Sequence, residues 1–402
     1  MQQPRYYQVD HRHLFIFGFV FYLLTPVIAG KMQLFDGYPG IALFQRFFSN
    51  IPASKIKSYV VITLSWLPAF FLGHALFSIF KPYKFSLIKF ASTLTSRNIS
   101  YISLGLLIAL ALFAYLGRGS ILGGYSSYDV AARGKISTLL VLFNFFLIYS
   151  LLTKQGIPVL LIAGTGLTSL LLLSMGGRMY VFQTITLLLM YKTSFAARRW
   201  KFYHLIILMI AAFFISGALG VWRMGATLNL PRALYSFFAE PVFTWISTAS
   251  YLANNHIPVV NFPENFLSSF INVVPNTFLN LRQFVVPTTA MSSGYESPLG
   301  ADSIWTNLVI NFGWVGSFFF VMLTGFVLNF LRHLSESGRF AACFYFMVCS
   351  LLPFQFFRDG FFILNKQLFF NFLFLPALSL LFLKFVLYAS VGRRNALVTN
   401  PG

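Results

Sequence analysis

Long uninterrupted runs of apolar residues constrain this chain more than any other feature. Two examples are Ile102–Leu116 and Ile157–Met175, which approach the roughly 17–25 residues that a helix needs to cross a bilayer. Hydrocarbon offers the backbone no hydrogen-bond partner, so only helices and closed barrels span it. Barrel strands alternate apolar and polar residues over about ten positions, and these runs do not alternate. The sequence therefore predicts an all-α polytopic membrane helix bundle.

Composition agrees with this prediction. Of the 402 residues, 57% are hydrophobic and only 9% are charged, whereas soluble domains carry about 25% charged residues. We predict about ten transmembrane helices in a single membrane domain, 1–402. The predicted spans are 14–30, 58–80, 99–116, 136–152, 157–175, 179–192, 203–221, 305–331, 341–357 and 368–390.

The charges between the spans predict the orientation. Basic loops around Lys89, Arg199 and Arg339 lie on the cytoplasmic side if the N-terminus is cytoplasmic, as the positive-inside rule expects. The other side then receives a large loop, about 222–304. Its apolar segments Leu234–Ser250 and Asn265–Val274 are expected to form short interfacial helices.

The formal net charge of +20 raises the question of nucleic acid, because basic surfaces neutralise phosphates. The basic residues are spread in small groups between apolar runs, and the sequence has no recognised nucleic-acid module. We therefore exclude nucleic acid as a partner. Membrane lipids and anionic lipid-linked substrates are the partners that this pattern favours.

Several signatures of known chemistry are missing. The sequence has no Walker loop, no zinc-binding His-Glu-x-x-His, no Gly-x-Ser-x-Gly and no dinucleotide fingerprint. It also lacks an Asp-x-Asp pair that would hold a divalent cation. We therefore predict no cofactor and no metal, which disfavours a classical metal-dependent sugar transferase.

Arginines on the predicted outer side are the candidates for anion binding, because a guanidinium donates paired hydrogen bonds to phosphate and stays charged. Arg178 follows two glycines in a tight turn between two spans, where an ionisable residue is a functional hypothesis by default. For Arg178 the alternative role is snorkelling to lipid headgroups. For Arg118 and Arg133 it is an ion pair with Asp129, and for the arginines of the outer loop it is anchoring at the membrane interface. The predicted pyrophosphate-binding residues are Arg178, Arg223, Arg282, Arg118, Arg133 and Arg232.

Three residues of the outer loop are candidates for proton transfer. Glu296 and Asp302 are the carboxylates best placed to accept a proton at the boundary of loop and membrane. His256 is a further candidate base. In contrast, His74 is expected to be a polar contact inside the membrane, and His11 is expected at the cytoplasmic surface.

Four motifs follow one another along the chain. They are a Tyr/Arg loop from Tyr125 to Gly134, a Gly-Gly-Arg turn at Gly176 to Arg178, a Val-Pro motif at Val274 and Pro275, and Asn-Phe-Gly-x-x-Gly at Asn311 to Gly316. The order of these features resembles the Wzy-type oligosaccharide repeat-unit polymerases, also called O-antigen polymerases. The resemblance covers most of the chain, although many members carry a glutamate where this sequence has Thr306 and Asn307.

This resemblance implies a metal-independent glycosyltransferase in the bacterial inner membrane, with its active site facing the periplasm. Donor and acceptor would be glycans linked to undecaprenyl pyrophosphate, and the product would be O-antigen or a related polysaccharide. A chain-length regulator protein is a further implied partner. Two alternatives stay open: an O-antigen ligase, which shares the donor chemistry, and a flippase or transporter for lipid-linked oligosaccharides, which is not an enzyme.

Overall fold

A computed structural model describes residues 8–35, 38, 41–79, 94–121, 130–153, 156–195, 200–223, 225–273, 279 and 281–385. This part of the chain contains helices and no strands, which confirms the prediction of an all-α fold. Six of its helices are long and apolar enough to cross a membrane, and they indicate a membrane protein. They are His11–Lys31, Ala53–Ile79, Ser96–Leu116, Ala131–Thr153, Ile304–Leu334 and Phe361–Phe385.

Most of the predicted spans fall on single helices, but 341–357 covers α13 and part of α14 with a turn between them, and 386–390 lie outside the described residues. The total of about ten crossings remains a prediction. The first helix is continuous and contains α1 (His11–Phe19), the π-helical η1 (Val20–Leu24) and α2 (Thr25–Lys31). The following helices are α3 (Ile41–Asn50), α4 (Ala53–Ile79), α5 (Ser96–Leu116), α6 (Val130–Thr153), α7 (Val159–Ser174), α8 (Arg178–Ser194), α9 (Phe202–Arg223) and α10 (Leu230–Asn254). Then come α11 (Glu264–Ser269), α12 (Ile304–Leu334), α13 (Arg339–Leu351), α14 (Gln355–Arg358), α15 (Phe361–Asn365) and the π-helical η8 (Lys366–Phe374).

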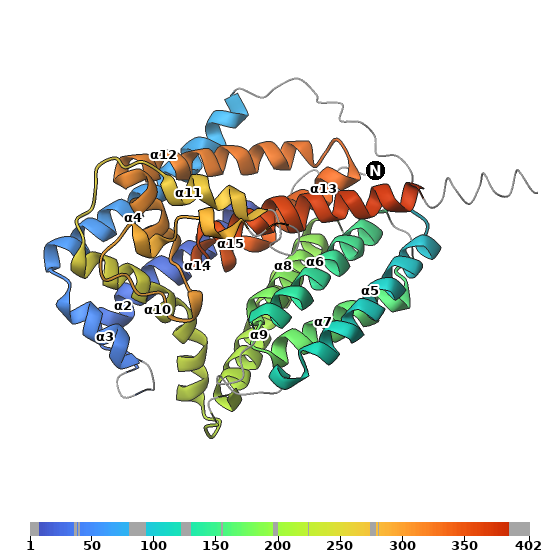
Figure 1. Cartoon of the computed structure of the whole chain (residues 1–402), viewed down its shortest axis with the longest axis horizontal. Coiled ribbons are helices and arrows are strands. Elements are labelled where there is room, and N and C mark those ends of the chain that lie inside the picture. The colour runs from blue at the N-terminus through green and yellow to red at the C-terminus, as the bar shows by residue number, and fades with distance from the viewer. Residues whose placement is uncertain are drawn as a thin grey trace, which may run out of the picture.

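Two groups of helices are visible in Figure 1. One contains α5 to α9, which lie beside one another as an inclined layer at the lower right. The other contains α12, which runs across the top of the view, and α4, which rises from the left and packs on it, with α10 and α3 below them on the left. The helix α9 contacts α10, and α13 contacts both α8 and α12, so the two groups form one body.

Glycines allow α4 and α12 to approach backbone to backbone. A Cβ added at Gly73 would lie 1.8 Å from the carbonyl oxygen of Met322, and one at Gly325 would lie 2.1 Å from that of Phe70. Small residues are common where transmembrane helices meet, because packing replaces the hydrophobic effect in lipid. The Trp66 indole also donates a 3.2 Å hydrogen bond to the Ser317 hydroxyl, so this pair of helices is joined along its length.

The predicted outer loop differs from expectation in one element. Leu234–Ser250 was expected to be a short interfacial helix, but it belongs to the 25-residue α10, which is largely buried against α3 and α9. Trp245 is fully buried and packs on Phe44 and Tyr59. The Ser, Thr and Ala residues of α10 lower its mean hydropathy. For this reason hydropathy alone does not indicate that α10 is a buried helix. Asn265–Val274 coincides with α11 and the following 3₁₀ turn, up to Val273.

The Asn-Phe-Gly motif interrupts α12. Gly313 has φ 69° and ψ −179°, which breaks the regular hydrogen bonding of the helix. The loop before α11 satisfies the freed groups: Trp314 N–H donates to the carbonyl of Pro258 at 2.9 Å, and Val315 N–H donates to that of Val259 at 3.1 Å. The Asn311 side chain accepts a 2.8 Å hydrogen bond from Phe266 N–H. The motif therefore fastens the loop to the helix.

Candidate functional site

Arg178 is placed by the turn that the sequence predicts. Gly176 has φ 79°, a left-handed conformation that glycine adopts without strain. The turn ends α7 and allows α8 to begin at Arg178. From there the guanidinium reaches α9, where its Nη1 donates to the carbonyl oxygen of Ser216 at 3.0 Å and contacts the Ser216 hydroxyl at 3.3 Å.

A partly buried set of ion pairs surrounds Arg178. Glu240, in the middle of α10, lies with its Oε2 3.7 Å from Arg178 Nη2. Its other oxygen, Oε1, accepts a hydrogen bond from Nε of Arg358, the last residue of α14. Arg358 Nη1 also donates to Asp359 at 2.6 Å. Three elements that lie far apart in the sequence thus meet at one carboxylate.

Arg133 brings a third cation, through electrostatic interactions with Glu240 and Asp359. The set formed by Arg133, Arg178, Arg358, Glu240 and Asp359, which we call the arginine cluster, has three formal positive charges and two negative ones. Burial alone would raise the pKa of Glu240, but the charges of Arg358 and Arg178 outweigh it and lower that pKa. Glu240 is therefore ionised at neutral pH, and the cluster has a formal excess of one positive charge.

Arg178 and Glu240 line a narrow cleft with a cavity volume of about 10 Å³, which has room for about one water molecule. The remaining lining consists of five aromatic residues, Phe21, Tyr22, Phe182, Phe237 and Phe354, together with Met179 and Ser216. Phe21 and Tyr22 belong to the π-helical η1, and π-helical turns are frequent at functional sites. Apolar walls around a few fixed polar groups are typical of a ligand site, and a ligand larger than water would enter this one only if the surrounding side chains moved.

Asp302 is the predicted proton acceptor that lies next to the arginine cluster, against the turn at Gly360. Its Oδ1 accepts a 2.6 Å hydrogen bond from the Tyr295 hydroxyl. A Cβ added at Gly360 would lie 3.0 Å from Asp302 Oδ2 and 3.1 Å from Asn307 Oδ1. Asp302 therefore packs on the turn that follows Arg358 and Asp359. Burial raises the pKa of Asp302, although the hydrogen bond from Tyr295 opposes this effect.

The other two candidate bases lie apart from the arginine cluster. The side chains of Glu296 and His256 are exposed. Only backbone atoms of these residues take part in hydrogen bonds within the described ranges: Glu296 N–H donates to the Ser250 hydroxyl, and the His256 carbonyl accepts from Tyr251.

The remaining predicted arginines do not join the arginine cluster through any contact among the described residues. Arg118 is exposed and stacks over Tyr115, 4.7 Å from the ring centre. Arg232 donates to the carbonyl of Thr227 at 2.9 Å. Arg223 ends α9 and Arg282 begins a short 3₁₀ turn, but their side chains lie outside the described part. The predicted pyrophosphate contacts of Arg223 and Arg282 thus stay predictions. Tyr125 and Val274, which carry part of the family resemblance, lie outside the described residues.

Sequence reasoning missed Glu240, Arg358 and Asp359 as site residues. A signal was present in each case. Glu240 is a lone acidic residue in a long helix with few charges, and Arg358–Asp359 is a pair of opposite charges directly after an apolar run. Ionisable residues in such places are usually paired with one another and functional.

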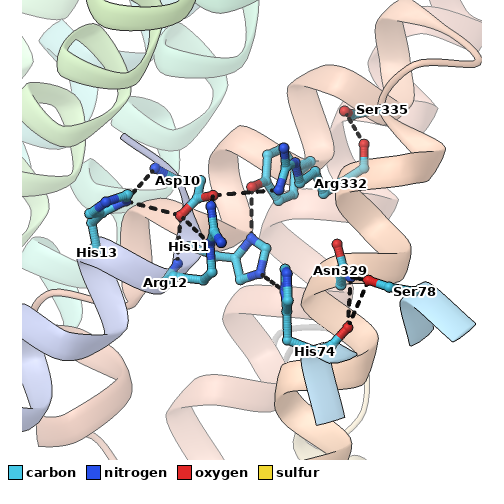
Figure 2. Close-up of polar contacts among 10 residues, drawn as sticks. Asp10, His11, Arg12, His13, His74, Ser78, Asn329, Arg332 and Ser335 are labelled. Carbon is cyan, nitrogen blue, oxygen red and sulfur yellow. Dashed lines mark hydrogen bonds and ion pairs between the residues drawn. The ribbon is translucent and has the colours of Figure 1, made fainter. Parts of the chain in front are cut away.

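A second polar cluster lies where α1, α4, α12 and α13 meet (Figure 2). Asp10 is fully buried and caps the first helix by accepting from the Arg12 backbone N–H at 3.0 Å. The Arg12 guanidinium donates to Asp10 Oδ2 at 2.7 and 2.9 Å, and Arg332 Nη1 lies 3.5 Å from the same oxygen. The hydrogen bond from Arg12 and the nearby positive charges outweigh the effect of burial and lower the pKa of Asp10 to about 2.

His11 belongs to this cluster, so the prediction that it lies at the surface is wrong. It is fully buried, with Nδ1 2.9 Å from the Tyr345 hydroxyl and Nε2 3.1 Å from His74 Nδ1. These contacts, drawn in Figure 2, fasten the first helix to α4 and α13. The expected intramembrane polar contact of His74 is present and is made with His11. The polar side chains of this cluster pair with one another and hold the first helix against its neighbours.

The residues that the structure describes contain no group of three or more His, Cys, Asp or Glu that could hold a metal ion. Metal independence itself stays a prediction. Comparisons with protein-family models, curated proteins and solved structures find no match to this chain. The chemistry of the arginine cluster and its cleft is therefore what bears on function.

Proposed function

We propose that this chain is a metal-independent membrane glycosyltransferase that polymerises undecaprenyl-pyrophosphate-linked oligosaccharide repeat units, like the O-antigen polymerases it resembles. It would work at the periplasmic face of the bacterial inner membrane. The observation that carries the proposal is Arg178 in its aromatic cleft. Ser216 fixes one amino group of its guanidinium, while the other is only loosely paired and available to a pyrophosphate.

In the proposed reaction an acceptor hydroxyl attacks the anomeric carbon of the donor glycan. The bond from that carbon to the pyrophosphate oxygen breaks, and the pyrophosphate leaves with its lipid. The hydroxyl proton passes to Asp302, whose raised pKa brings it closer to the working pH of a general base. Arg178 stabilises the charge that develops on the leaving pyrophosphate, the kind of electrostatic effect that often dominates catalysis.

The test is elongation of lipid-linked repeat units by purified full-length protein in nanodiscs, with EDTA present. We expect a ladder of polymer products that EDTA does not abolish. Arg178→Ala should slow elongation by about 10²–10³, or about 3–4 kcal/mol of barrier, by analogy with the loss of an oxyanion donor. Arg178→Lys should restore only part of the rate, since lysine keeps the charge without the planar fork.

Arg46→Ala is the matched control, because Arg46 is exposed and its guanidinium lies over the Phe47 ring, 5.2 Å from the ring centre. It should elongate at the wild-type rate. Equal rates for Arg178→Ala and Arg46→Ala would refute the role of the cleft. Transfer of glycan only to lipid A–core would identify a ligase, and movement of lipid-linked glycan across the bilayer without a new glycosidic bond would identify a transporter.

A further inference from the structure

Tyr295 and Asp302 are brought together by the loop that precedes α12. Gly294 has φ 62° and Gly300 has φ 70°, left-handed conformations that glycine adopts without strain. These two glycines turn the chain at both ends of the segment between them. The Tyr295 hydroxyl thereby reaches Asp302 Oδ1 and donates to it at 2.6 Å, a distance typical of a hydrogen bond from a hydroxyl to an ionised carboxylate.

The helix α10 holds the backbone next to both partners. Its Ser250 hydroxyl accepts a 3.0 Å hydrogen bond from the N–H of Glu296, the residue after the tyrosine. Its Ser247 hydroxyl accepts one of 2.9 Å from the N–H of Ser303, the residue after the aspartate. Residues three apart lie on the same face of a helix. One face of α10 therefore fixes the loop at two points, and the contact between tyrosine and aspartate lies between them in the sequence.

Asp302 needs such a partner, because its surroundings disfavour its negative charge. Burial raises the pKa of Asp302, and the charge of Asp359 raises it further. The hydrogen bond from Tyr295 is the largest effect that opposes this rise, and the side chain of Ser297 and the positive charge of Arg358 act in the same direction. A hydrogen bond to the charged form of a carboxyl group favours that form. Without the tyrosine hydroxyl, the carboxyl group would therefore already be protonated at a higher pH.

Tyr295 itself remains a hydrogen-bond donor. Its side chain is buried in the hydrophobic core. Burial and the negative charge of Asp302 raise the pKa of the Tyr295 hydroxyl well above its usual value. The phenol consequently keeps its proton at any pH at which the protein works, and it orients the carboxylate without taking part in proton transfer.

We propose that Tyr295 is a positioning residue that holds the Asp302 carboxylate in the form and orientation in which it accepts a proton. This inference rests on the proposed function, in which Asp302 takes the proton of the acceptor hydroxyl. Tyr295 influences the rate only through Asp302. The polar residues of α10 then have two tasks: Glu240 meets the arginine cluster, and the two serines hold the loop that carries the base.

The experiment records the rate of elongation by the full-length protein in nanodiscs as a function of pH. In the wild type the rate should fall at low pH, where Asp302 becomes protonated. Tyr295→Phe removes the hydroxyl and keeps the ring. The fall should then occur at a pH about one to two units higher, from the usual strength of a hydrogen bond to a charged group. Above that pH the rate should recover toward that of the wild type.

Tyr251→Phe is the matched control. Tyr251 lies on α10, and its hydroxyl donates to the carbonyl oxygen of His256 at 2.9 Å. The variant loses a tyrosine hydroxyl of the same region, but the bond that it loses is to a backbone carbonyl. It should keep the wild-type dependence on pH.

A double variant tests whether Tyr295 acts through Asp302. Asp302→Asn removes the base and should slow elongation. The addition of Tyr295→Phe to Asp302→Asn should cause no further loss, because the effects of two residues that act as a unit are not additive. If Tyr295→Phe does not fold, 3-fluorotyrosine in place of Tyr295 gives the same test. It keeps the shape of the side chain, and its more acidic hydroxyl donates a stronger hydrogen bond, so the fall in rate should move to lower pH.

The outcomes separate this inference from the proposed function. If the wild type does not elongate lipid-linked repeat units, or if Asp302→Asn elongates at the wild-type rate, the proposed function and this inference are both refuted. If Asp302→Asn is slow but Tyr295→Phe lowers the rate by the same factor at every pH, or leaves the profile unchanged, only the inference about Tyr295 is overturned. A further loss in the double variant, or a wild-type profile with 3-fluorotyrosine, has the same meaning.

Discussion

Replacement of Gly313 by alanine should destabilise the protein strongly, because Gly313 lies where the backbone and the packing both require glycine. Its φ of 69° and ψ of −179° fall near a region that is essentially restricted to glycine. A Cβ at this position would also lie 2.4 Å from the carbonyl oxygen of Val259. Either the helix or the loop must therefore move.

The expected magnitude follows from these contacts. The backbone conformation costs a non-glycine residue about 1–3 kcal/mol. Displacing the loop removes the hydrogen bonds that Trp314 and Val315 donate to Pro258 and Val259, each of which contributes about 0.5–1.5 kcal/mol. The free energy of unfolding should consequently fall by about 2–6 kcal/mol, from these two contributions together.

The assay is thermal unfolding of the purified variants in detergent, followed by tryptophan fluorescence. Gly105→Ala is the matched control: Gly105 lies inside α5, and a Cβ there would meet nothing within 4 Å. Its melting temperature should stay at or above that of the wild type, since alanine is the better helix former by about 1 kcal/mol. If Gly313→Ala melts at the same temperature as Gly105→Ala, the proposed interruption of α12 and its attachment to the loop are refuted.

Two further predictions concern other parts of the fold. Asp10→Asn should lower stability at neutral pH by about 2 kcal/mol, the worth of a pKa shift of this size. The pKa of Asp10 is lowered to about 2 in the folded protein. The difference in stability between the wild type and Asp10→Asn should therefore be largest above pH of about 4 and vanish as the pH falls toward 2. A difference in melting temperature that does not depend on pH would contradict this prediction. Gly220→Ala should separate α9 from α10, because its Cβ would overlap the Ser236 hydroxyl at 1.6 Å. We expect a lower melting temperature, which Ser236→Gly should partly restore in the double variant. Wild-type stability of Gly220→Ala alone would refute this packing.

The helices themselves could be read from the sequence, because backbone hydrogen bonding and hydropathy are local properties. In a long apolar run such as Ser96–Leu116 each amide bonds to a carbonyl four residues away, so no distant residue has to be known. The Gly176 turn is local in the same sense, since a left-handed residue between two helices favours glycine. The same reasoning placed Arg178 in the turn between two spans, and in the structure it is the first residue of α8.

Pairings between distant residues depended on the tertiary structure. Glu240 and Arg358 are 118 residues apart, and His11 and His74 are 63 apart. In a chain with so few charges, each ionisable residue has several possible partners, and the relative position of whole helices selects among them. That position results from contacts such as those of Gly73 and Gly325 between α4 and α12, which hydropathy does not record.

The burial of α10 is the clearest case of a feature that only packing decided. Its Ser, Thr and Ala residues lower its hydropathy, yet the same small side chains let α3 and α9 pack closely against it. The sequence by itself thus determined an α-helical membrane protein with an arginine at a glycine turn. Which carboxylates meet that arginine, and which aromatic side chains surround it, followed from long-range packing, because the energy of those contacts exists only once the helices are assembled.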